Sequence, residues 1–215
     1  MTLWAIVSDI HGRGDRLARV LADAQSLRAE RVLALGDIAS PVALDMLQAV
    51  DAEYVFGNWE ASGLRGQRAP YRGWIARWPA QFRADGFLAA HASPVWPPKL
   101  SIAHVVEHLR SNNLHWSALF PSIRHSEEAR WAAFAELDAE DISVFFHGHT
   151  HVQEAWRWPP GGAPSHIPGS AGELTLDAAA RWLIGVGSVG EPHDGAGAAY
   201  ALYDTAARLL RWRRV

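Results

Sequence analysis

Residues 3–12, LWAIVSDIHG, place an aspartate and a histidine shortly after a run of five apolar residues. A short apolar run of this kind predicts a buried strand. The following stretch, DRLARVLADAQSLRAE (15–30), repeats apolar residues at intervals of three and four, which is typical of an amphipathic helix. A buried strand followed by such a helix is the repeating unit of an α/β fold.

The same alternation continues through the first two thirds of the chain. The predicted strands are 2–8, 31–36, 53–57, 87–91 and 142–147, and further helices are predicted at 41–50, 101–111 and 126–138. Beyond residue 151 the proline- and glycine-rich segment 156–172 predicts a mobile loop. Three strand-like runs follow, at 181–190, 198–204 and 208–215, and they indicate a second, more antiparallel sheet packed on the first.

The composition is that of one globular domain, which we expect to span residues 1–215. Apolar residues make up 49% of the chain and charged residues 20%, so a substantial core can form and disorder is excluded as the main state. The net charge of −3 offers no basic surface for general nucleic-acid binding. The absence of cysteine excludes disulfides and thiolate metal sites. The first apolar run ends at Asp9, too early for a signal peptide or membrane span, so we expect a cytoplasmic protein with no membrane partner.

Each of the five predicted strands ends in side chains that can bind a metal ion or a phosphate. Such strand ends converge at one edge of an open α/β sheet. In extended backbone, residues two apart face the same side, which would pair the two candidates of SDIHG and those of GHTH. Neighbouring glycines let the chain turn there. The candidates are Asp9, His11, Asp37, Asn58, His91, His149 and His151, and the glycines are Gly12, Gly36, Gly57 and Gly148.

This ligand set fits a pair of divalent ions. Two ions about 3.5–4 Å apart can clamp the attacking and leaving oxygens of a displacement at phosphorus. One carboxylate must bridge them, and Asp37 is the natural candidate. Two such ions, two aspartates and a bridging hydroxide leave a net positive charge, so the site would attract an oxyanion. The metal-bound hydroxide would then be the nucleophile.

With these motifs in order, SDIHG, LGDI, FGNWE, AAHAS and HGHTH, the sequence resembles the calcineurin-like metallophosphoesterases. GSVGEPHDG (187–195) and the YALYD strand make it most similar to a small bacterial phosphodiesterase-like branch. The resemblance implies a two-sheet sandwich flanked by helices (αββα) and a binuclear centre of manganese, iron, zinc or nickel. It implies that Asp9, His11, Asp37 and His151 hold one ion, and that Asp37, Asn58, His91 and His149 hold the other.

The chain departs from the family pattern at two places in its site. Trp59 replaces the histidine that interacts with the leaving group, and an indole cannot act as an acid. We therefore expect a phosphodiesterase more than a monoesterase. Arg13 replaces the usual asparagine, and its guanidinium offers paired donors to a phosphate. The arginine-bearing motif of the serine/threonine phosphatases is absent, because GDIASP stands in its place.

Further roles follow for individual side chains. Asn58 and His91 are candidate catalytic residues as well as ligands. Trp59 and Arg13 are candidate substrate contacts. His193 is either a substrate contact, and then a candidate for the missing acid, or a surface loop residue. His147 is expected to be structural.

Two other functions remain open at this point. The chain could be a metal-binding or metal-free scaffold that has lost catalysis, which Trp59 favours and the intact ligand set disfavours. A peptidase built on HVVEH (104–108) would need a third zinc ligand that the sequence does not supply. The resemblance implies a phosphoester small molecule as the substrate class, with specificity in loops 92–140 and 152–180. It does not identify the substrate itself, the metal or the oligomeric state.

Overall fold

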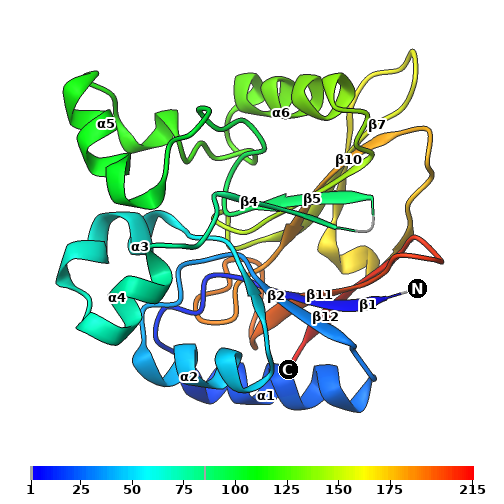
Figure 1. The fold of residues 1–215 in the computed structure, drawn as a ribbon. Coiled ribbons are helices and arrows are strands. Elements are labelled where there is room, and N and C mark those ends of the chain that lie inside the picture. Colours follow the sequence, from blue (N-terminus) through cyan, green and yellow to red (C-terminus); the bar gives the residue numbers. More distant parts are fainter. Residues whose placement is uncertain (1, 85) are drawn as a thin grey trace.

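The computed structural model describes residues 2–84 and 86–215 and shows two mixed six-stranded sheets stacked face to face (Figure 1). Apolar side chains from both sheets, among them Ile6, Leu33, Phe146 and Tyr203, fill the space between them. Helices α1 (Gly14–Ser26) and α2 (Pro41–Ala49) cover the outer face of one sheet. Helix α6 (Glu127–Ala139) covers the outer face of the other. The αββα sandwich expected from the resemblance is confirmed.

The first sheet has the strand order β3-β2-β1-β11-β12-β9. Strands β1, β2 and β3 are parallel to one another, and β11 joins β1 in antiparallel register with Ile6 opposite Ala201. Along β1, Trp4 and Ile6 face the second sheet while Ala5 and Val7 face the helices, the period of two that a strand requires. The strands are β1 (Leu3–Val7), β2 (Arg31–Ala34), β3 (Glu53–Tyr54), β9 (Glu173–Thr175), β11 (Ala199–Asp204) and β12 (Leu209–Arg214).

The second sheet has the order β4-β5-β6-β10-β7-β8. Its centre is parallel, because β5, β6 and β10 run in one direction, and its two ends are antiparallel. The strands are β4 (Gln81–Ala84), β5 (Phe87–Ala90), β6 (Val144–His147), β7 (Gln153–Trp158), β8 (Ser165–Pro168) and β10 (Arg181–Val186).

Short helices gather beside one end of the sandwich (Figure 1). These are α3 (Asn58–Gly63), α4 (Ala69–Ile75) and α5 (Val105–Ser111), with the 3-10 turns η1 (Leu64–Gly66), η2 (Ile102–His104) and η3 (Trp116–Ala118), while η4 (Gly169–Ala171) lies near β7. Within the described residues, no helix has the length and apolar character needed to cross a bilayer.

Two expectations about the C-terminal third were wrong. The three late strands do not form a sheet of their own, because β10 enters the centre of the second sheet while β11 and β12 extend the first. A strand buried over nearly its whole length, like β10, must have neighbours on both sides. The expected loop at 156–172 is largely the hairpin β7–β8, and the proline- and glycine-rich run supplies only its turn.

Strand β4 and the helices α3 and α4 were not predicted. Strand β4 has four residues and lies at a sheet edge, and each of the two helices has seven residues or fewer. Segments this short carry too few repeats of an apolar pattern to be recognised.

Candidate metal centre

The loops that follow β1 and β2 run side by side and present three of the predicted ligands. The backbone N–H of Asp9 donates to the carbonyl of Gly36 at 3.1 Å, and that of His11 donates to the carbonyl of Asp37 at 3.0 Å. Gly12 continues the pairing by donating to Ile38 at 2.9 Å. The parallel pairing of the two strands is thus prolonged into their loops, which holds Asp9, His11 and Asp37 in register.

Three of the remaining ligands, His91, His149 and His151, follow strands of the second sheet, whereas Asn58 follows β3 of the first. The loops after β5 and β6 are joined by the Gly148 N–H, which donates to the carbonyl of His91 at 3.0 Å. The backbone N–H of His149 then donates to Asp9 Oδ2 at 2.9 Å, which ties this sheet to the first. The expectation that all strand ends meet at the edge of one sheet was therefore wrong. The candidates converge where the ends of two facing sheets meet.

Five of the seven candidate ligands have a left-handed backbone. The φ angles are +52° at Asp9, +46° at His11, +55° at Asp37, +60° at His149 and +58° at His151. The extended backbone assumed for SDIHG and GHTH was wrong, because each ligand lies in a tight turn just past its strand. A non-glycine residue in such a conformation costs about 1–3 kcal/mol, and such residues cluster at functional sites.

The four glycines next to the ligands have two different roles. Gly12 and Gly36 have φ values of +76° and +89°, so they make the turns as expected. Gly57 and Gly148 instead permit close approach. A Cβ on Gly148 would lie 1.8 Å from Ser8 Oγ, and one on Gly57 would lie 2.1 Å from the Oδ1 atom of Asp37. No larger residue fits at either position.

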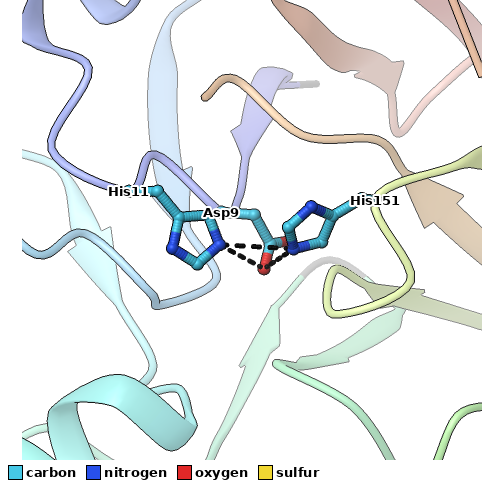
Figure 2. A group of neighbouring side chains, drawn as sticks. All are labelled: Asp9, His11 and His151. Carbon is cyan, nitrogen blue, oxygen red and sulfur yellow. Dashed lines mark hydrogen bonds and ion pairs between the residues drawn. The ribbon is translucent and has the colours of Figure 1, made fainter. Parts of the chain in front are cut away.

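Asp9, His11 and His151 form the first group of candidate ligands (Figure 2). The Nε2 atoms of His11 and His151 face each other at 3.2 Å, and Asp9 Oδ1 lies 3.2 Å from His151 Nε2 and 3.8 Å from His11 Nε2. Asp9 Oδ1 is buried and accepts no hydrogen bond. The Nδ1 atom of His151 bonds the carbonyl of Glu191 at 2.7 Å, which aims Nε2 into the group.

Asp9, Asp37 and His91 form the second group. His91 Nε2 lies 3.6 Å from Asp37 Oδ2 and 3.0 Å from the side-chain oxygen of Asn58. Its Nδ1 bonds the carbonyl of Leu35 at 2.7 Å, and the ring of His149 is centred 5.1 Å away. Asp9 is the carboxylate common to both groups, so the bridging role of Asp37 stays a prediction.

The charges at this centre favour a cation. Burial raises the pKa of Asp37 to about 6, and the nearby carboxylates of Glu60 and Asp9 add to this effect. Burial opposes ionisation of Asp9, but the His11 and His151 imidazoles outweigh it and hold the pKa of Asp9 well below its usual value. Burial lowers the pKa of His149 to about 4. Burial also opposes protonation of His151, but the Asp9 carboxylate 3.2 Å away outweighs it and raises the pKa of His151 to about 8.

The residues present fit divalent metal ions. The carboxylates are buried, carry like charge, and include the unbonded oxygen of Asp9. Imidazole nitrogens complete the set, and such mixed donors suit manganese, iron, zinc or nickel. Bound cations would remove the repulsion between the Asp9 and Asp37 carboxylates. They would also accept the lone pairs of the imidazole nitrogens that face one another in the cluster.

Glu60 is a positioning residue that the sequence analysis missed. Its buried carboxylate accepts hydrogen bonds from the backbone N–H groups of Asp37 and Ile38 at 2.8 Å, and of Gly57 at 2.9 Å. It therefore holds the loops that carry Asp37 and Asn58 together. The available signal was the spacing Gly57-x-x-Glu60 at the start of α3, where the Glu60 side chain reaches back to the N–H of the N-cap residue as in one half of a capping box.

The candidate substrate contacts lie at the exposed edge of the centre. The Trp59 indole is 52% exposed and meets the His11 ring edge-on, with centroids 5.0 Å apart. His193 is exposed and stacks on His151 at 4.6 Å. Arg13 is exposed, and its guanidinium is paired with Asp15 through two hydrogen bonds of 3.0 Å.

Histidines outside this set take no part in either ligand group of the described chain. His147 is buried and bonds the carbonyl of Gly148 at 3.0 Å, in keeping with a structural role. In HVVEH, His104 is exposed and bonds Ser101, and no third ligand joins it and His108 among residues 2–84 and 86–215.

Comparison with solved structures finds the same fold in several phosphoesterases. A metallophosphoesterase from Sphaerobacter thermophilus aligns with a TM-score of 0.71 at 22% identity, covering 99% of this chain and 88% of that one. An archaeal phosphodiesterase aligns with a TM-score of 0.53 at 12% identity over 99% of both chains. Zinc-bound Vps29 from Entamoeba histolytica aligns with a TM-score of 0.51 at 13% identity, covering 99% of this chain and 98% of that one.

The sequence itself carries the family assignment. None of the curated proteins matches the chain. Residues 1–208, however, match the calcineurin-like phosphoesterase superfamily domain, and this range includes every candidate ligand described above. The chain belongs to the calcineurin-like phosphoesterase superfamily.

Proposed function

We propose that this protein hydrolyses a phosphodiester with two divalent metal ions, working as one catalytic domain. The observation that carries the proposal is a buried cluster in which an Asp9 oxygen that accepts no hydrogen bond faces two imidazole nitrogens. The cluster contains Asp9, His11, His151, Asp37 and His91. Asp9, His11, Asp37 and His151 would hold one ion. Asp37, Asn58, His91 and His149 would hold the other.

The ions, when bound, lower the pKa of coordinated water toward neutrality and neutralise the phosphoryl oxygens. The chain's own residues supply orientation. The Leu35 and Glu191 carbonyls fix the ring orientation of His91 and His151, and the carboxylate of Glu60 fixes the Asp37 loop. Asn58 and His91 lie close enough to each other, at 3.0 Å, to contact the same phosphoryl group.

The preference for a diester rests on Trp59. In the family pattern a histidine at this position can protonate a departing oxygen, and an indole cannot. A leaving group that is stable as an anion needs no such proton, whereas basic leaving groups do. His193, stacked on His151 at the opposite edge, is the candidate for a replacement acid.

The test combines metal analysis with two chromogenic esters. After chelation and reloading with Mn²⁺, we expect about two ions per chain. We also expect faster cleavage of bis(p-nitrophenyl) phosphate than of p-nitrophenyl phosphate. One ion at saturation would overturn the two-metal assignment, and equal rates on the two esters would overturn the diester preference.

A second candidate function is a metal-binding scaffold without catalysis. Trp59 in place of the leaving-group histidine favours it, and Vps29 proteins share the fold. The same experiment separates the two, because a folded and fully metallated protein that cleaves neither ester would be a scaffold.

A further inference from the structure

Four aromatic rings form a continuous row across the candidate metal centre. Trp59 contacts His11 with centroids 5.0 Å apart, His11 lies 5.0 Å from His151, and His151 stacks on His193 at 4.6 Å. The two central rings are candidate metal ligands. The two outer rings are exposed and belong to neither ligand group.

Trp59 is held firmly although its ring is exposed. It is the second residue of α3, and its backbone N–H donates to Asp37 Oδ1 at 2.9 Å. Glu60, the next residue, is anchored by three backbone N–H groups. The backbone that carries the indole is therefore held by the same hydrogen bonds that hold the Asp37 loop, and the ring itself rests against His11.

The exposure of this ring is unusual for the chain. Among the large apolar side chains of the described residues, Trp59 and Trp131 are the aromatic ones with a large exposed fraction. Trp131 packs against Trp158 and Phe134, with centroids 5.5 and 6.2 Å away, which gives it a structural role. Trp59 has its ring contact with a candidate metal ligand instead.

We infer that Trp59 is a specificity-determining residue whose indole stacks on a planar aromatic group of the substrate, so that the preferred esters are nucleoside phosphodiesters. The inference rests on the proposed function, which puts a phosphate at the neighbouring ions. A nucleoside joins a planar base to its phosphate through a sugar, so a phosphate at the ions would carry such a group beside them. Stacking of a base on an aromatic side chain contributes about 1–3 kcal/mol and tolerates every base, because each has a π-face.

The test uses two esters that differ only in the group that stays on phosphorus. The p-nitrophenyl ester of thymidine 5′-monophosphate and p-nitrophenyl methyl phosphate release the same leaving group. For the wild type we expect kcat/KM to be about 10-fold higher for the nucleoside ester, within the range that stacking supplies. Trp59→Leu should bring the ratio close to one, Trp59→Phe should keep part of it, and Trp131→Leu should leave it unchanged.

A binding measurement separates failure of this inference from failure of the proposed function. By calorimetry, the Mn²⁺-loaded protein should bind thymidine 5′-monophosphate about 10-fold more tightly than methyl phosphate, and Trp59→Leu should abolish the difference. If the protein shows this binding preference but cleaves neither ester, the proposed function is wrong, whereas the stacking of the Trp59 indole on a base stands. Cleavage of both esters with equal kcat/KM, or an equal loss on both in Trp59→Leu, would overturn the inference alone.

Discussion

The ligand cluster and the exposed edge beside it are built in opposite ways. In the cluster, backbone hydrogen bonds join the loops, five of the seven candidate ligands lie in left-handed turns, and Asp9, Asp37 and His91 are almost fully buried. At the edge, Trp59, Arg13 and His193 are exposed. The resemblance assigns every residue of the cluster to the ligand set of the family and predicts departures at Trp59 and Arg13. On that assignment, we expect the chemistry shared with the family to reside in the buried turns, and what distinguishes this chain to reside in the exposed side chains.

The largest effect is expected from Asp37→Asn, which tests whether the buried cluster holds the metal ions. The change removes a buried carboxylate charge that we assign to both ions, so metal content should fall from about two ions per chain to less than one, and diesterase activity by about 10³-fold or more. Metal analysis after gel filtration and initial rates provide the measurement.

Asp23→Asn is the matched control for this change. Asp23 lies on α1, outside the cluster, where its carboxylate bonds Arg213 and the Tyr200 hydroxyl. That variant should lose some thermal stability and keep its metals. If Asp37→Asn retains both ions, the shared-carboxylate assignment is wrong.

The next largest effect is expected at the exposed edge, from Trp59→His. Restoring the family residue supplies a group that can protonate the leaving oxygen, so alkyl esters should be cleaved up to about 10²-fold faster and nitrophenyl esters little faster. The measurement is the dependence of rate on the pKa of the leaving group, accompanied by a thermal melt.

Trp59→Phe is the control, since phenylalanine keeps an apolar ring and adds no acid. An unchanged leaving-group dependence in folded Trp59→His would mean that another group, with His193 the first candidate, donates the proton, or that proton transfer does not limit the rate.

A smaller effect should follow from Glu60→Gln, which leaves every ligand in place. A glutamine has one carbonyl oxygen for the three N–H groups that now point at a carboxylate, and its own N–H₂ faces donors. We expect metal affinity to fall about 10-fold and the free energy of unfolding to fall by about 1–3 kcal/mol. Metal titration and denaturant unfolding measure the two effects.

Glu128→Gln, an exposed glutamate in the first turn of α6, should change neither quantity. Unaltered metal affinity in Glu60→Gln would show that the Asp37 loop is held without this carboxylate.

The sequence predicted much of this arrangement because strands and their ends leave strong signals. All five predicted strands of the first two thirds exist, with ends shifted by at most three residues, and the candidate ligands follow the predicted strands. The partition of strands between two sheets was not predictable, because pairing partners depend on packing across the whole domain. For the same reason β10 was assigned to the wrong neighbours.

Local geometry at the site was predicted less well than the identity of the residues. The spacing of Asp9 and His11 is compatible with an extended pair and with two left-handed residues separated by one residue, and only the hydrogen bonds to the Asp37 loop select the second. Glu60 was missed because two of its three backbone contacts, those with Asp37 and Ile38, are to residues far from it in the chain. Its residue type alone is that of an ordinary helix N-terminus.

The smallest expected effect concerns Arg13. Its measurement distinguishes a guanidinium that contacts bound phosphate from one that is paired only with Asp15. In the structure the guanidinium is paired with Asp15, so a phosphate bound at the metals would have to compete with that carboxylate. If Arg13 contacts the phosphate, Arg13→Ala should weaken inhibition by inorganic phosphate about two- to five-fold, the range of an exposed ion pair. Asp15→Ala should strengthen inhibition by a similar factor, because it frees the guanidinium. Ser26→Ala, a change near the end of α1, serves as the control. Opposite shifts in the two inhibition constants would establish the contact, whereas two unchanged constants would mean that Arg13 belongs only to its ion pair with Asp15.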